Sequence, residues 1–168
     1  MRIDEFGDVG VQLEAENVPD PPEAYNEVMR ILRFECDIGK GDIQENQYQH
    51  EKDGDTERIF SEIRAYDPKG KFSFIYVKVK IFIEMKPAKH EDYDYVGDIE
   101  VNGSARVRTH YPQESWFQQT ILWHAFRVFF EKVLYNDVRQ VFLNECDEYM
   151  MYIRDGLKSY FDMLPTIK

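Results

Sequence analysis

The stretch 72–85, which reads FSFIYVKVKIFIEM, carries the clearest structural pattern in the chain. Successive side chains of a β-strand point to opposite faces, and this stretch alternates in that way. The odd positions from Ile75 to Met85 are aliphatic or carry sulfur, whereas the even positions are aromatic or charged. The pattern predicts a long strand with one face on an aliphatic core and a second face of different chemistry.

The neighbouring segments predict the rest of a sheet. Residues 57–66 repeat the alternation, residues 43–50 are polar and extended in character, and Asp53-Gly54-Asp55 forms a turn between them. Residues 95–111 contain Asn102-Gly103, which often marks a hairpin. A tight hairpin there would mix apolar and charged residues on each face. We therefore predict one continuous strand, bent or bulged at Gly97 or Gly103.

Helical patterns flank the predicted strands. Asp20-Pro21-Pro22-Glu23 is typical of a helix start, with Asp20 as the N-cap. The stretches 116–135 and 137–163 predict two long helices, the first apolar around most of its circumference. Residues 1–20 fit either an edge strand or an acidic tail. We expect a single α+β domain: a four-stranded antiparallel sheet, five-stranded if 1–20 joins it, with an N-terminal helix and two long C-terminal helices packed on one face.

Composition limits the classes of protein that the chain can represent. The 168 residues suit one domain, and no apolar run is long enough to span a membrane. The charged N-terminus does not resemble a signal peptide, so we expect a cytoplasmic protein with two reduced cysteines. The net charge of −11 arises in residues 1–57, because 58–168 contain equal numbers of acidic and basic residues. This acidic excess opposes binding to nucleic acid and to anionic membranes.

The sequence contains no recognisable catalytic or cofactor motif. It has no phosphate-binding glycine loop, no G-x-S-x-G motif and no zinc-protease pattern. The acidic loop 90–94, with Asp98 nearby, lacks the spacing of a calcium-binding loop, and we expect a solvated loop. These observations predict a protein that is not an enzyme and that holds no cofactor or metal ion.

The second face of the predicted sheet is the main candidate for function. It combines aromatic and basic side chains, and residues 64–89 are locally basic. We interpret it as a face that binds a protein partner, and we expect that partner to be a second copy of the chain. An alternative is single-stranded nucleic acid, because Lys69–Tyr76 loosely resembles an RNA-recognition motif; the inserted Lys71 and the order of elements depart from that motif. The face consists of Phe72, Phe74, Tyr76, Lys78, Lys80, Phe82, Arg106 and Arg108.

A second hypothesis is that the protein carries a small apolar ligand. A curved sheet that grips a long helix can enclose a pocket. A filled core would use the same large rings equally well. The candidate lining residues are Trp116, Trp123, Phe126, Phe130 and Tyr149.

The C-terminal part of the chain shows a resemblance. The stretches 97–101 (GDIEV), 105–112 (ARVRTHYP), 132–135 (KVLY) and 157–161 (LKSYF) are similar to a set of archaeal α+β proteins without an assigned activity. The resemblance implies an archaeal cytosolic setting and transfers no functional residue.

Overall fold

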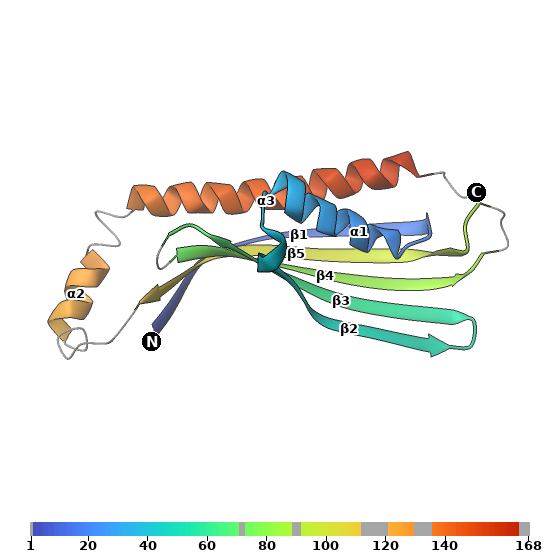
Figure 1. The fold of residues 1–168 in the computed structure, drawn as a ribbon, viewed down its shortest axis with the longest axis horizontal. Helices are drawn as coiled ribbons and strands as arrows, with labels where there is room; N and C mark the ends of the chain where they lie inside the picture. Colours follow the sequence, from blue (N-terminus) through green and yellow to red (C-terminus); the bar gives the residue numbers. More distant parts are fainter. Residues whose placement is uncertain (1, 71–72, 89–91, 112–120, 130–135, 165–168) are drawn as a thin grey trace.

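The protein is an α+β domain built on one antiparallel sheet. The computed structural model describes residues 2–70, 73–88, 92–111, 121–129 and 136–164. Within these residues the chain forms the elements shown in Figure 1: β1 (Arg2–Pro19), α1 (Glu23–Arg30), a π-helical turn η1 (Ile31–Glu35), a 3₁₀ turn η2 (Lys40–Asp42), β2 (Ile43–Asp53), β3 (Thr56–Pro68), β4 (Ser73–Pro87), β5 (Tyr95–Tyr111), α2 (Ile121–Phe129) and α3 (Asn136–Met163).

The five strands lie in the order β1-β5-β4-β3-β2. Strands β2 to β5 follow one another as antiparallel neighbours, and β1 pairs with β5 at the far edge. The N-terminal segment is thus an edge strand, which settles the choice between a strand and a tail. The prediction of one unbroken strand over 95–111 is confirmed by β5. Strand β5 itself is continuous, and the irregularities lie in its partner β1, between Phe6 and Val9 and, near Gly97, between Ala15 and Val18, where Asn17 has a φ of 53°.

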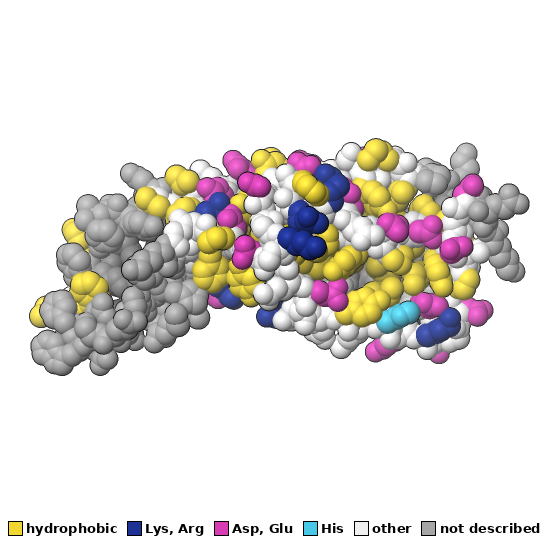
Figure 2. Space-filling view, viewed as in Figure 1, with side chains coloured by type: hydrophobic (Ala, Val, Ile, Leu, Met, Phe, Trp, Pro, Cys, Tyr) yellow, Lys and Arg dark blue, Asp and Glu magenta, His cyan; other side chains and the backbone are white. Residues whose placement is uncertain are grey.

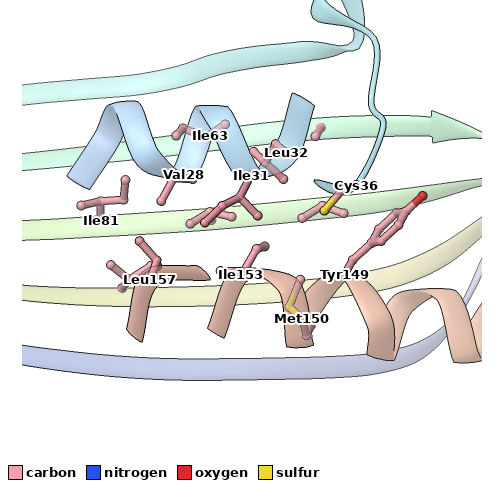
Figure 3. Packing of buried hydrophobic residues seen from close by; sticks show 14 of the residues in the cluster. Val28, Ile31, Leu32, Cys36, Ile63, Ile81, Tyr149, Met150, Ile153 and Leu157 are labelled. Atoms are coloured by element: carbon pink, nitrogen blue, oxygen red, sulfur yellow. The ribbon is translucent and has the colours of Figure 1, made fainter. Parts of the chain in front are cut away.

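The core lies between the aliphatic face of the sheet and two helices, α1 and α3. Figure 1 shows both helices on the same side of the sheet, and α3 packs across β1 and β5. Ile31 of η1 and Ile153 and Leu157 of α3 are fully buried between the layers, as seen in Figure 3. Burying a side chain of this size contributes about 1.5–3 kcal/mol. The alternation predicted for this strand is confirmed, because the buried apolar residues of β4 on this face are Ile75, Val77, Val79, Ile81, Ile83 and Met85.

The start of the first helix differs from the prediction. Helix α1 begins at Glu23 after Pro22, and no side chain caps it. The Asp20 carboxylate instead accepts hydrogen bonds from the backbone N–H groups of Asp94 and Tyr95, at 3.1 and 3.0 Å. The Asp20 N–H donates to the Tyr95 carbonyl at 2.9 Å. Asp20 therefore ties the corner after β1 to the start of β5, because those strand amides compete with the helix for its carboxylate.

The second C-terminal helix covers the sheet as expected, whereas the first does not. Helix α3 closely matches the predicted stretch 137–163. Only Ile121–Phe129 of the predicted helix 116–135 is described, as α2, and Figure 1 shows it beyond the end of the sheet. Ile121 and Leu122 are 87% and 77% exposed there. One long C-terminal helix, rather than two, packs on the sheet, and no described helix is long and apolar enough to cross a membrane.

Candidate functional site

The side of the sheet that faces away from α1 and α3 carries the predicted functional residues. We call it the open face, because no described helix lies over it (Figure 1). The strand registers arrange its side chains in rows that run across β5, β4 and β3. From one end to the other the rows are Asp98–Glu84–Arg58, Glu100–Phe82–Phe60, Asn102–Lys80–Glu62, Ser104–Lys78–Arg64, Arg106–Tyr76–Tyr66 and Arg108–Phe74–Pro68.

One end of the open face is aromatic and basic, as the sequence predicts. The Tyr66 ring lies 5.8 Å from the Phe74 ring and 5.3 Å from the Tyr76 ring, between centroids. The Arg108 guanidinium lies 3.9 Å above the Tyr76 ring, which is a cation–π contact. Tyr76 is buried, and burial raises its pKa. The three rows from Ser104–Lys78–Arg64 to Arg108–Phe74–Pro68, together with Lys80, are called the basic half below.

Most of the arginine charge in the basic half is already neutralised. Arg106 and Arg108 contact the Glu5 carboxylate of β1 at 2.9 and 2.6 Å, and Arg106 holds the pKa of Glu5 below its usual range. Arg64 pairs with Glu62 at 2.6 Å. Lys78 and Lys80 are half-buried, and neither forms an ion pair with another described residue. The two lysines are thus the charges that a partner would meet. Phe72 of the predicted site lies outside the described residues.

The other end of the open face is a hollow of about 610 Å³. Its floor contains the Phe60 and Phe82 rings, with centroids 4.8 Å apart, and Phe82 is 40% exposed. We call this hollow the acidic groove, because six carboxylates and one guanidinium line it. The guanidinium is that of Arg58 in β3, and the carboxylates come from the other four strands. The carboxylates are Glu14, Glu16, Glu51, Glu84, Asp98 and Glu100.

Neutral side-chain amides, rather than cations, contact two of these carboxylates. The Gln12 amide donates to Glu14 at 3.0 Å and to Glu100 at 3.4 Å, and the Asn102 amide donates to Glu100 at 2.7 Å. Arg58, the one cation, pairs with Glu84 at 2.9 Å and lowers the pKa of Glu84. The groove keeps an excess of five negative charges. A hollow lined by one sign of charge concentrates its electric field toward a partner of opposite sign.

Sequence reasoning missed the acidic groove for a physical reason. Its lining residues come from all five strands, between positions 14 and 100, and only the sheet order brings them together. The acidic excess of residues 1–57 was the one available signal, because Glu14, Glu16 and Glu51 belong to it.

The residues of the expected apolar pocket are only partly described, and Tyr149 among them contacts polar side chains. Tyr149 of α3 is buried, and its hydroxyl donates to Asp67, which also pairs with Lys69 at 2.7 Å. Trp123 lies in α2, and the structure does not describe Trp116, Phe130 or the side chain of Phe126. It thus describes only two of the five residues of the expected apolar pocket.

The cysteines and the acidic loop offer no reactive group in the described part of the chain. Cys36 and Cys146 are buried, and burial raises the pKa of each thiol to about 12, so both stay protonated at neutral pH. The described residues contain no cluster of three metal-ligating side chains. His90 and Glu91 of the acidic loop lie outside them.

A smaller hollow of about 210 Å³ lies on the helix-bearing face, beside the start of α1. Figure 2 shows hydrophobic side chains gathered on this face. Tyr25, Tyr48 and Ile81 line the hollow with Ser61, whose buried hydroxyl has no hydrogen-bond partner among the described residues. Burial and the neighbouring Glu45 raise the pKa of Tyr25 to about 12.

Comparison of the sequence with models of known protein families and with curated proteins finds no match for this chain.

Proposed function

We propose that the protein is a non-catalytic interaction module that forms homodimers through its open face. The observation that carries this proposal is the one-sided cover of the sheet. Both packed helices lie on one face, and the other face presents rings, the acidic groove and two lysines that pair with no described carboxylate. The solvent face of an antiparallel sheet is normally polar throughout. The exposed Phe82 ring and the half-buried Phe60, Tyr66 and Phe74 rings alternate with charged side chains. Aromatic residues at the centre of a patch with a polar rim are typical of an interface.

The size of the open face suits a stable dimer. Five strands spaced by about 4.8 Å give a width of about 24 Å, and the span from Asp98 to Arg108 is about 34 Å at about 3.4 Å per residue. The product, roughly 800 Å², equals the area that each partner buries in a standard protein–protein interface.

Sedimentation velocity over a wide range of protein concentration tests the proposal. We expect a dimer whose population rises with concentration, as mass action requires. Phe82→Ser should shift the equilibrium toward monomer, because it removes the exposed ring of the groove floor. Phe34→Ser is the matched control, since Phe34 is 69% exposed in η1, away from the open face. A wild-type chain that stays monomeric throughout would contradict the proposal.

A second candidate function rests on the 210 Å³ hollow. The unpartnered Ser61 hydroxyl on an apolar wall fits a small apolar molecule with one hydrogen-bonding group. Thermal shifts with phenol and indole test this hypothesis, and Ser61→Ala should reduce any shift. The hollow is smaller than the roughly 300 Å³ at which ligand pockets usually begin, which favours the interaction module.

A further inference from the structure

We infer that two copies pack their open faces with their strands antiparallel, so that the basic half of each copy lies over the acidic groove of the other. This inference rests on the proposed homodimer and specifies its geometry. It follows from the charges of the rows, from the shape of the groove and from the symmetry of dimers.

The net charge of the rows changes from acidic to basic along the strands. The rows Asp98–Glu84–Arg58 and Glu100–Phe82–Phe60, with the flanking Glu14, Glu16 and Glu51, form the acidic end. The row Ser104–Lys78–Arg64 is basic, and the row Asn102–Lys80–Glu62 between them is mixed. The open face is therefore bipolar along the strand direction.

A homodimer usually has a two-fold axis, and an axis between two stacked sheets can run along the strands or across them. An axis along the central strand, β4, would keep each row on itself with its strand order reversed, so that Glu84, Lys80 and Lys78 would each lie over its own counterpart. An axis across the strands reverses the order of the rows. When it passes through the row that contains Lys80, only that row faces itself, with Lys80 over Lys80 and Glu62 over Glu62. Lys78 and Arg64 of one copy then lie over the Glu100–Phe82–Phe60 row of the other. Like charges placed opposite each other disfavour an interface, so the charges select the axis across the strands.

The acidic groove suits the side chains that this arrangement delivers. Lys and Arg have long stems, and stacked sheets lie about 10 Å apart, so these side chains can enter a hollow in the facing sheet. The groove offers carboxylates at its walls and the Phe60–Phe82 pair at its floor. A cation can meet both at once, through ion pairs and a cation–π contact. Lys78 forms no ion pair with a described residue of its own copy, so the contact breaks none.

Charge reversal on the two sides of the predicted contact tests the geometry. Lys78→Glu alone and Glu100→Lys alone should each weaken the dimer by about tenfold or more. In each variant residues 78 and 100 carry charges of the same sign, and the two-fold axis repeats this repulsive contact. In an equimolar mixture of the two variants every such contact is again of opposite sign. We expect the mixture to form a heterodimer with nearly the wild-type dissociation constant, measured by sedimentation. Lys158→Glu and Glu148→Lys, on the exposed side of α3, are matched controls that should remain dimeric.

The outcomes separate the inference from the proposed function. A dimer that Phe82→Ser dissociates but that the mixed variants fail to restore would overturn the antiparallel arrangement and leave the open face as the interface. A dimer that both reversals leave intact would overturn it as well. A monomeric wild type would remove the homodimer itself. If that monomer bound an oligolysine peptide through Glu100, the occupant of the groove would be a foreign basic segment, which also overturns the inference.

Discussion

At the scale of single residues, Gly97 fixes how closely β5 approaches β4. A Cβ atom at this position would lie 2.2 Å from the Glu84 carbonyl oxygen and 2.6 Å from the Met85 Cα. Both are backbone atoms, so a strand, rather than a side chain, would have to move to remove the steric overlap. We predict that Gly97→Ala lowers the free energy of unfolding by about 1–3 kcal/mol, the usual cost of overpacking.

Urea denaturation measures this change. Gly70→Ala serves as the control, because a Cβ atom at Gly70 meets no atom within 4 Å. Equal stability of Gly97→Ala and the wild type would mean that β5 lies farther from β4 than the structure shows.

At the scale of elements, a buried polar contact fastens α3 to the connection between β3 and β4. Lys69 pairs with Asp67 at 2.7 Å and with Glu145 of α3 at 2.5 Å, and the Tyr149 hydroxyl donates to Asp67. Burial opposes the charge on Lys69, but the two carboxylates raise its pKa well above the ordinary value. Burial and the Asp67 carboxylate likewise raise the pKa of Tyr149. Lys69 therefore stays charged and the Tyr149 hydroxyl stays protonated near neutral pH.

Removing one hydroxyl tests this contact. We predict that Tyr149→Phe lowers the free energy of unfolding by about 1.5–3 kcal/mol, the usual value for a hydrogen bond to a charged group. Tyr152→Phe on the exposed side of the same helix should change it by less than about 0.5 kcal/mol. Chemical denaturation of both variants measures the difference, and equal effects would show that Asp67 does not need the Tyr149 hydroxyl.

The same scale shows which elements the sequence could predict. Strands β4 and β5 were predictable because every second residue, from Ile75 to Met85 and from Ile99 to Val107, is apolar and buried against the helices. Strand β1 was ambiguous because bulges between Phe6 and Val9 and between Ala15 and Val18 break its alternation.

The errors also have physical causes. Local pattern assigned Asp20 to a helix cap, whereas strand amides distant in the sequence take its carboxylate. The apolar character of 116–135 indicated burial, yet the described α2 lies beyond the sheet. The basic half could be foreseen from two strands, while the acidic groove required the order of all five.

At the scale of the whole molecule, paired carboxylates make stability sensitive to acid. Cationic partners lower the pKa of Glu5, Glu57, Glu84 and Asp155. A carboxyl with a lower pKa in the folded than in the unfolded state stabilises the protein above the unfolded value, and the contribution disappears as pH falls through the folded value. We predict a nearly constant free energy of unfolding above pH 5 or so, and a decline once the pH falls below 4.5, the ordinary glutamate value.

Glu57→Gln tests the contribution of one carboxylate to the pH dependence of the free energy of unfolding. Its carboxylate pairs with Lys52 at 2.7 Å and with His50 at 2.9 Å. The variant should lose less stability than the wild type between neutral and acidic pH, measured by urea denaturation at each pH. Glu148→Gln is the control on the exposed side of α3, and an unchanged slope in Glu57→Gln would contradict the prediction.

The charge of the whole molecule also bears on nucleic acid. The net charge is −11, and the acidic groove adjoins the basic half on the same face. At about 0.15 M salt the Debye length is about 8 Å, so charges farther apart than this are largely screened. The acidic groove directly adjoins the basic half, and its carboxylates therefore still repel a nucleic acid bound there. We predict no measurable binding of single-stranded DNA or RNA at that salt concentration. Sub-micromolar binding in a fluorescence polarisation titration would contradict this prediction and favour the hypothesis that the basic half binds single-stranded nucleic acid.

The pairing of β1 with β5 has a consequence for the order in which the chain can fold. Strand β1 precedes the other described strands in the chain, and within the described sheet its partner is β5, so β1 cannot pair until residues 95–111 have been made. The segments that become β2, β3, β4 and β5 can pair with their neighbours as they emerge. Contacts between distant segments slow folding, because a long loop must close before they form. Until β1 arrives, the edge of β5 stays unpaired and open to other chains, which makes the interval before this last pairing the time when the nascent protein is most prone to aggregate.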